Sequence, residues 1–195
     1  MKLIIQIPCF NEAKTLPGVI RDLPRSLPGI SQIEYLVIDD GSSDNTVAVA
    51  HELKVHHVLQ LGSNRGLAFA FSQGIRYALD QGADIVVNTD GDNQYAGEDI
   101  GLLVQPVAEG KADIVVGCRP IKAHKEFSPV KKLLQLMGSW IMRKISKTDV
   151  KDAPSGFRAF SREACLRMFI YSRFSYTMET LIQAGNSNQI GRAHV

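Results

Sequence analysis

Short apolar runs alternate with amphipathic segments along residues 4–117, and this alternation constrains the fold more than any other feature. Runs rich in Ile, Val and Leu occur at residues 4–7, 33–38, 55–61, 85–87 and 113–117, and segments with helical spacing lie at 13–23, 46–53, 67–80 and 100–108. Strands that alternate with helices over short loops pair in parallel through right-handed crossovers. The sequence therefore predicts an α/β fold with a doubly wound, mostly parallel sheet and helices on both faces.

Length and composition narrow the class of protein. A chain of 195 residues with 45% hydrophobic residues is long enough to bury one core, which favours a single domain. A net charge of +2 gives no support to nucleic-acid binding, which calls for a clearly basic domain. The three cysteines are widely spaced, the chain begins with a strand-like segment, and no apolar run is long enough to span a membrane. These features predict a cytoplasmic protein.

Polar loops follow the predicted strands at residues 8–12, 39–44, 62–66, 90–94 and 117–119. In an open parallel sheet, ligands bind at the carboxyl ends of the strands, so these loops are expected to converge on one edge. Turn residues such as Gly, Asn and Asp would gather there in any protein of this class. Glu12, Arg65 and Arg119 are not typical turn residues, and their presence favours a binding site.

The loop after the fourth strand carries two acids one residue apart, in Asp90-Gly91-Asp92, followed by Gln94. Two carboxylates and an amide oxygen form a hard oxygen site suited to Mg²⁺ or Mn²⁺. The alternative is a solvated turn, because this motif also arises by chance. Since carboxylates repel phosphates, acids beside arginines favour a diphosphate bound through a metal ion. The sequence contains neither a P-loop nor the glycine fingerprint of classical dinucleotide sites.

The pattern changes after residue 120. Residues 129–145 are predicted to form an amphipathic helix with basic residues at Lys131, Lys132, Arg143 and Lys144. Such a helix either packs on the core or lies at a membrane surface, and both interpretations stay open. Residues 152–160 form a compact segment fixed by Pro and Gly, and further helices are predicted at 163–168 and 175–184.

Several motifs in order carry a family resemblance: Pro8-Cys9-Phe10-Asn11-Glu12, Asp39-Asp40-Gly41-Ser42, Asn64-Arg65-Gly66, Asp90-Gly91-Asp92 and Gly156-Phe157-Arg158. With them, residues 2–184 resemble the family 2 inverting glycosyltransferases of GT-A fold, and among these most closely the dolichyl- or polyprenyl-phosphate sugar synthases. The resemblance implies one catalytic domain, with a nucleotide-sugar half at about 1–119 and an acceptor half at about 120–195. Because the related synthases usually continue further, we expect the acceptor half to be cut short.

The resemblance also implies roles for individual residues. The nucleotide site would comprise Pro8, Phe10, Asn11, Glu12, Asp39, Arg65, Gly66, Asp90 and Gly91. Within it, Asp39 would accept a hydrogen bond from the base and Asp90 would hold the ribose. Asp92 and Gln94 would bind the metal, and Arg119 would lie near the phosphates. The acceptor site would comprise Lys132, which stands where the family often carries arginine, together with Asp152 and Arg158.

The predicted reaction is metal-dependent, inverting transfer of a sugar from a UDP- or GDP-sugar to a polyprenyl or dolichyl phosphate at the cytoplasmic face of a membrane. The predicted catalytic residues are Asp92, Arg119 and Glu179. A lipid phosphate is already an anion and needs no general base, whereas a glycan hydroxyl would need a carboxylate such as Glu179 or Asp152. Transfer to a glycan and a sugar-nucleotide-binding module without turnover are the two alternatives.

Overall fold

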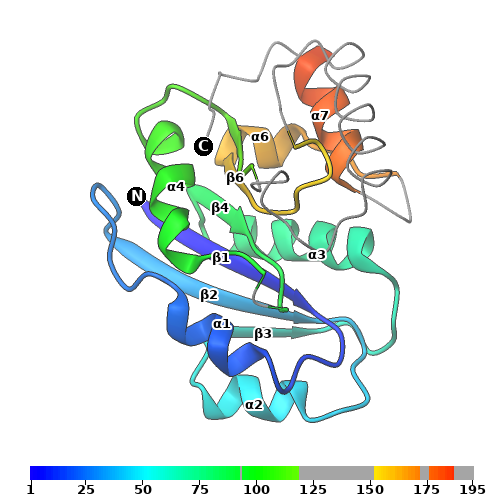
Figure 1. Cartoon of the computed structure of the whole chain (residues 1–195). Coiled ribbons are helices and arrows are strands. Elements are labelled where there is room, and N and C mark those ends of the chain that lie inside the picture. Colours follow the sequence, from blue (N-terminus) through cyan, green and yellow to red (C-terminus); the bar gives the residue numbers. More distant parts are fainter. Residues whose placement is uncertain (93, 119–151, 172–175, 187–195) are drawn as a thin grey trace, which may run out of the picture.

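The computed structural model describes residues 1–92, 94–118, 152–171 and 176–186. The helices and strands in these residues, in chain order, are β1 Lys2–Cys9, α1 Leu16–Asp22, β2 Gln32–Asp39, α2 Thr46–Glu52, β3 His57–Gln60, α3 Leu67–Asp80, β4 Ile85–Asn88, the short 3₁₀ helix η1 Gly97–Asp99, α4 Ile100–Ala108, β5 Ile114–Val116, β6 Arg158–Ser161, α6 Arg162–Arg167 and α7 Tyr176–Asn186. They build the predicted α/β architecture (Figure 1).

The strands form one sheet in the order β3-β2-β1-β4-β6-β5. β1 pairs in parallel with both β2 and β4, and β2 pairs in parallel with β3. The prediction of a doubly wound, mostly parallel sheet is confirmed for these strands. The prediction for residues 152–160 was incomplete, because part of this segment forms β6, which lies antiparallel between β4 and β5.

Two apolar cores flank the sheet, one on each face. Along β1, Leu3, Ile5 and Ile7 face the core covered by α1, α2 and α4, whereas Ile4 faces the core covered by α3, α6 and α7. Successive side chains of a strand point to opposite faces, so a strand covered on both sides is apolar at nearly every position. This accounts for the uninterrupted runs in the sequence.

The parallel pairing brings the carboxyl ends of β1, β2, β3 and β4 to one edge of the sheet. The register places Cys9 opposite Asp39, and Asp39 opposite Gln60. The loops that follow these strands are therefore neighbours, as predicted. Among the described residues, no helix is both long and apolar enough to cross a membrane.

Candidate active site

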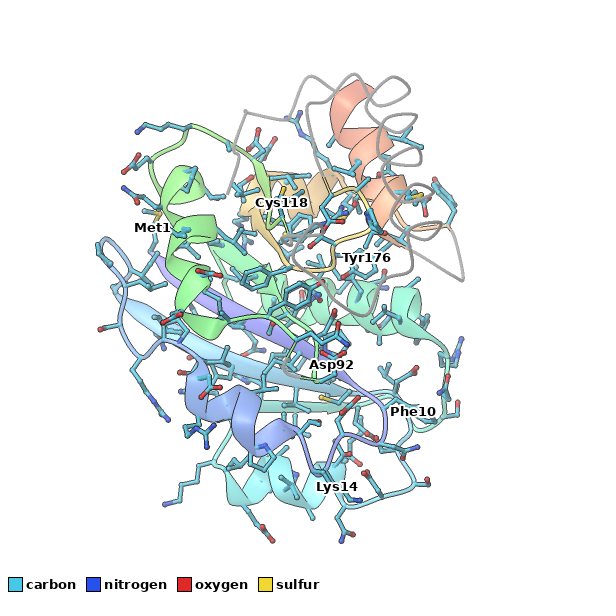
Figure 2. All side chains as sticks on the ribbon, viewed as in Figure 1. Met1, Phe10, Lys14, Asp92, Cys118 and Tyr176 are labelled. Atoms are coloured by element: carbon cyan, nitrogen blue, oxygen red, sulfur yellow. The ribbon has the colours of Figure 1, made fainter. Side chains whose placement is uncertain are left out.

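The loop after β1 is fastened to the loop after β2 by Asn11. Its side-chain oxygen accepts hydrogen bonds from the backbone nitrogens of Ser43, at 2.8 Å, and Asp44, at 3.3 Å, while its own backbone nitrogen donates to Ser42 Oγ at 2.9 Å. Asn11 has φ +58°, a left-handed conformation that asparagine tolerates better than most residues. Phe10 beside it is 46% exposed at the rim of the edge (Figure 2). Asn11 thus shapes the site through its contacts with the second loop.

Two consecutive acids, the last residue of β2 and the residue that follows it, have different partners. Asp39 Oδ1 accepts one hydrogen bond, at 3.2 Å, from the backbone nitrogen of Ser42. Asp40 uses both carboxylate oxygens, which accept from the backbone nitrogens of Arg65 and Gly66 at 2.8 Å each. Both acids are 4% exposed. Asp40, which was not predicted as a site residue, therefore positions the loop after β3.

Arg65 carries its charge over an aromatic ring. The guanidinium carbon lies 4.2 Å from the centre of the Phe69 ring, one turn along the start of α3. A cation over an aromatic face is held by the ring's electrostatic quadrupole. A cavity of about 400 Å³ opens here, and its lining residues are Asn64, Arg65, Ala68, Phe69, Ser72, Ile170 and Tyr171.

The loop after β4 lies against the end of β1. A Cβ atom at Gly91 would stand 3.0 Å from Cys9 Sγ and 3.3 Å from Glu12 Cγ, so glycine permits this close approach. Asp92 is exposed, and its Oδ1 accepts from the backbone nitrogen of Gln94 at 3.1 Å (Figure 2). Asp92 therefore shapes its own loop while its carboxylate remains accessible to a ligand.

Acidic side chains gather around Cys9. Burial raises the pKa of the Cys9 thiol, and the negative charges of Glu12, Asp39, Asp44 and Asp90 raise it further. These carboxylates come from three different loops. Because four carboxylates lie around one point, a phosphate group that approaches it would be repelled unless a cation neutralised part of this charge.

No three acidic, histidine or cysteine side chains in the described part of the chain cluster tightly enough to hold a metal ion by themselves. The loop after β4 offers Asp90, Asp92 and the amide of Gln94. One or two carboxylates with further oxygens from substrate phosphates is the usual protein contribution to a Mg²⁺ site. The donor set therefore fits a Mg²⁺ or Mn²⁺ ion that binds together with a nucleotide.

The predicted acceptor residues Asp152 and Arg158 are fully buried. Arg158 donates to the backbone oxygens of Ser155, Thr177 and Ala153 and to Thr180 Oγ1, over 2.7–2.8 Å. Burial lowers the pKa of Arg158 to about 10, so the guanidinium stays charged at neutral pH. In this structure Arg158 ties residues 153–158 to α7, and its contact with an acceptor stays a prediction.

The remaining predicted residues divide into two groups. Glu179, in the first turn of α7, accepts at 3.0 Å from the backbone nitrogen of Tyr171, and its catalytic role stays a prediction. Arg119, Lys132 and the helix predicted at 129–145 lie outside the described residues.

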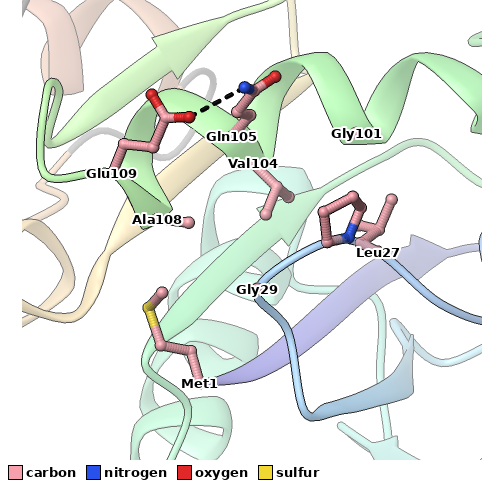
Figure 3. A pocket seen from close by; sticks show the side chains of 9 residues that line it. Met1, Leu27, Gly29, Gly101, Val104, Gln105, Ala108 and Glu109 are labelled. Atoms are coloured by element: carbon pink, nitrogen blue, oxygen red, sulfur yellow. Dashed lines mark hydrogen bonds between the residues drawn. The ribbon is translucent and has the colours of Figure 1, made fainter.

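Another cavity, of about 410 Å³ and mostly apolar, lies near the amino end of β1, between Met1, the turn at Leu27 and Gly29, and α4 (Figure 3). No predicted site residue lines it.

The chain is similar to known glycosyltransferases. The sequence model for glycosyl transferase family 2 matches residues 4–169. A UDP-N-acetylglucosamine–dolichyl-phosphate N-acetylglucosaminyltransferase from Methanococcus voltae is 32% identical over 81% of this chain and 68% of its own length. A polyprenol monophosphomannose synthase from Mycolicibacterium smegmatis is 30% identical over 83% of this chain and 62% of its own.

A solved structure supports the same fold. Glucosyl-3-phosphoglycerate synthase from Mycobacterium tuberculosis, crystallised with Mn²⁺, UDP and glucosyl-3-phosphoglycerate, superposes with a TM-score of 0.73 at 19% identity, over 95% of this chain and 66% of that one. The chain thus spans about two thirds of the length of these proteins. The fold is of the GT-A type, and the resemblance read from the motifs is confirmed. The chain belongs to glycosyl transferase family 2.

Proposed function

We propose that this chain transfers a sugar from a nucleoside-diphosphate sugar to a polyprenyl or dolichyl phosphate, with inversion at the anomeric carbon. The observation that carries the proposal is the acidic edge formed by Glu12, Asp39, Asp44 and Asp90, with the exposed Asp92 in the same loop as Asp90, in a family 2 domain. Relatives named for transfer to dolichyl phosphate and polyprenol support the choice of acceptor. The UDP and Mn²⁺ in the solved glucosyl-3-phosphoglycerate synthase support a nucleotide bound with a metal.

We assign a different role to each residue at the carboxyl edge of the sheet, where the sugar donor would bind. Asp39 accepts from the base, and Asp90 holds the ribose. Asp92 and Gln94 would hold Mg²⁺ or Mn²⁺, and the ion would supply positive charge beside the departing diphosphate. Arg119 adds a further positive charge near the phosphates. Arg65 and Gly66, fixed by Asp40, close the edge beside α3.

In the reaction itself, an oxygen of the acceptor phosphate forms a bond to the anomeric carbon. The bond between that carbon and the diphosphate oxygen breaks, and the nucleoside diphosphate leaves with the electron pair. Attack from the opposite face inverts the configuration. The acceptor is already anionic, so no side chain has to remove a proton.

Transfer to a glycan hydroxyl is the second candidate, and it requires a base. Asp152 is fully buried, and the carboxylate of Glu179 accepts from the backbone of Tyr171. The burial of Asp152 argues against it as this base and so favours the phosphate acceptor. A protein that binds sugar nucleotides without turnover is the third candidate. Such a protein would bind the sugar nucleotide but would release no free nucleoside diphosphate when acceptor is added.

The proposal is tested by offering polyprenyl phosphate and, separately, soluble oligosaccharides against a panel of UDP- and GDP-sugars. Radiolabelled sugar in the lipid fraction, with release of nucleoside diphosphate only when polyprenyl phosphate is present, is the expected result. Transfer to the oligosaccharide alone would move the chain to the second candidate. No transfer with any donor, despite nucleotide binding, would favour the third.

A further inference from the structure

A buried chain of hydrogen bonds runs beneath the loop that carries Asp90. Gln6 Nε2 donates to Asn88 Oδ1 at 2.9 Å, and Asn88 Nδ2 donates both to the Tyr176 hydroxyl at 2.9 Å and to the Gly156 carbonyl at 3.0 Å. The Tyr176 hydroxyl in turn donates to the same carbonyl at 3.3 Å. Gln6, Asn88 and Tyr176 are 0% exposed. These hydrogen bonds therefore link β1, β4, residues 152–158 and α7 through buried polar groups.

The peptide groups of Gly156 are held from both sides. While its carbonyl accepts from Asn88 and Tyr176, its nitrogen donates to the Tyr95 hydroxyl at 3.3 Å. The Tyr95 ring also stacks on Phe157, with 4.9 Å between ring centres and 12° between planes. Tyr95 follows the Asp90-Gly91-Asp92 turn, so the loop after β4 and the segment around Gly156 are fixed to each other.

The carboxylate of Asp90 rests on Gly156. A Cβ atom at position 156 would stand 3.2 and 3.3 Å from the two Asp90 carboxylate oxygens and 3.0 Å from the Tyr176 hydroxyl. The absence of a side chain at residue 156 thus lets Asp90 and Tyr176 approach the same point. A shift of the Gly156 peptide would therefore displace the Asp90 carboxylate and the Tyr176 hydroxyl.

Tyr176 is itself held rigidly. Its ring stacks on Phe71 of α3, with 3.7 Å between centres and 7° between planes. The start of α7 is anchored by Arg158, which donates to the Thr177 carbonyl and to Thr180 Oγ1. A hydroxyl fixed in this way can hold a peptide in one position.

We infer that Tyr176 is a positioning residue for Asp90. Its hydroxyl fixes the Gly156 peptide on which the Asp90 carboxylate rests, and α7 thereby sets the geometry of the nucleotide site from the acceptor half of the chain. The inference rests on the proposed function, because it concerns the residue assigned to the ribose. It adds a contact that couples the two halves.

The experiment compares Tyr176→Phe with Tyr35→Phe in the full 195-residue chain. Both substitutions remove one hydroxyl and keep the ring. Tyr35 is 4% exposed and donates to the Pro24 carbonyl at 3.0 Å, so its loss also removes a tyrosine hydrogen bond to a backbone oxygen, but from outside the nucleotide edge. Calorimetric titration with UDP and with GDP, each with Mn²⁺, measures the dissociation constant of each variant.

Tyr176→Phe is expected to weaken binding of the preferred nucleotide at least tenfold, and Tyr35→Phe less than twofold. In an Asp90→Asn background, adding Tyr176→Phe should change the dissociation constant less than twofold, because the residue through which Tyr176 acts has lost its charge. A general loss of stability would weaken binding in both backgrounds. If Tyr176→Phe does not fold, Gly156→Ala takes its place, since its methyl group would press on both the Tyr176 hydroxyl and the Asp90 carboxylate.

Tyr176→Phe binding as tightly as wild type overturns the inference and leaves the proposed function intact. The inference is also overturned if Tyr176→Phe weakens nucleotide binding tenfold both in the wild-type background and in the Asp90→Asn background. Wild-type chain that binds neither UDP nor GDP overturns the proposed function, and the inference with it.

Discussion

Neighbouring acids at the end of β2 serve different purposes because their oxygens meet different groups. Both carboxylate oxygens of Asp40 accept hydrogen bonds from the backbone nitrogens of Arg65 and Gly66. Asp39 accepts a single, longer hydrogen bond from the backbone nitrogen of Ser42. The sequence places both acids at the ligand edge, since both follow a buried strand. It does not separate the two, because the partners of Asp40 lie 25 and 26 residues further along the chain.

We predict that Asp40→Ala lowers the free energy of unfolding by about 3 kcal/mol, because two hydrogen bonds to a charged acceptor are lost. Asp39→Ala should lower the free energy of unfolding by only about 1 kcal/mol, and it should weaken nucleotide binding more than Asp40→Ala does. Urea denaturation and calorimetric titration measure the two quantities. Greater instability in Asp39→Ala, with nucleotide binding unchanged, would contradict the assignment of both residues.

At the scale of helices and strands, sequence reasoning succeeded where the pattern is local. Strands β1 to β5 were predicted within a few residues because each is an apolar run bounded by turn residues. β6 was missed, since it is four residues long and begins with an arginine. The buried carbonyls of residues 153, 155 and 177 and the Thr180 hydroxyl accept hydrogen bonds from Arg158 and so make that charge acceptable in a strand. Likewise, nothing near Asn88 in sequence indicates its bonds to residues 156 and 176.

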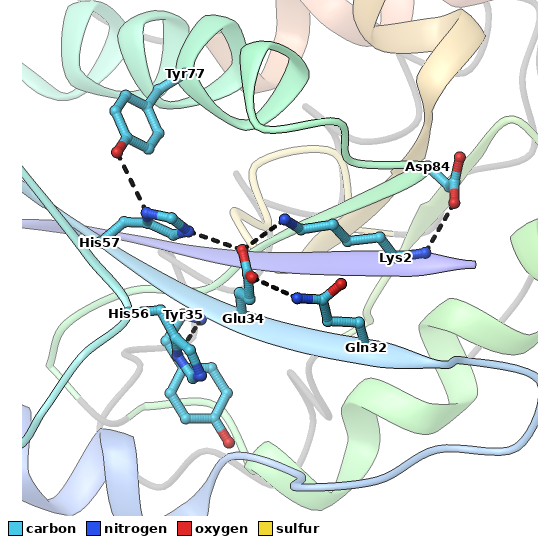
Figure 4. A network of polar contacts seen from close by, with 8 residues as sticks. All are labelled: Lys2, Gln32, Glu34, Tyr35, His56, His57, Tyr77 and Asp84. Carbon is cyan, nitrogen blue, oxygen red and sulfur yellow. Dashed lines mark hydrogen bonds and ion pairs between the residues drawn. The ribbon is translucent and has the colours of Figure 1, made fainter.

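A polar cluster fastens the edge strand β3 to its neighbours (Figure 4). Glu34 Oε2 of β2 lies 2.8 Å from Lys2 Nζ and 2.7 Å from His57 Nε2, and the Tyr77 hydroxyl of α3 lies 3.2 Å from His57 Nδ1. Burial alone would raise the pKa of Glu34, but hydrogen bonds from Lys2 and His57 and their positive charges outweigh it and lower the pKa below 4.5.

A carboxylate whose pKa is lower in the folded chain stabilises the fold above its unfolded pKa. The contribution of Glu34 should therefore be complete above about pH 5 and disappear as the pH falls through the folded pKa, below 4.5. Glu34→Gln should reduce the loss of unfolding free energy between pH 5 and 3, measured by urea denaturation at each pH. Identical acid dependence in wild type and variant would show that the cluster does not contribute.

The helix predicted at residues 129–145 carries the membrane hypothesis. If it meets an anionic surface, each basic residue there contributes about 1 kcal/mol, and the interaction weakens with salt. The chain should then sediment with vesicles containing anionic lipid, and Lys131→Glu with Lys132→Glu should abolish sedimentation without changing nucleotide affinity. Retained sedimentation in the double variant would exclude this surface, and no sedimentation of wild type at low salt would favour the packed helix.

For the whole molecule, the proposed function predicts that the nucleotide and the metal ion bind to the acidic edge only together. A ligand present at 100 times its dissociation constant stabilises the folded state by about 2.7 kcal/mol, which raises the melting temperature of a chain of this size by about 5–10 °C. We predict that UDP or GDP with Mn²⁺ produces this shift and that the nucleotide with a chelator does not. Asp92→Ala should lose most of it. An equal shift with and without Mn²⁺ would exclude the metal-bound diphosphate.

The position of β6 has a consequence for synthesis of the chain. Among the described strands, β5 pairs with β6 alone, and β6 also pairs with the edge of β4 that faces away from β1. Until residues 158–161 have been synthesised, β4 and β5 both lack the strand that lies between them in the folded sheet. The sheet beside the loop after β4 is thus completed late, after β6 has been synthesised. A chimaera that exchanges the second half between relatives would therefore have to keep Arg158–Ser161 matched to β4 and β5.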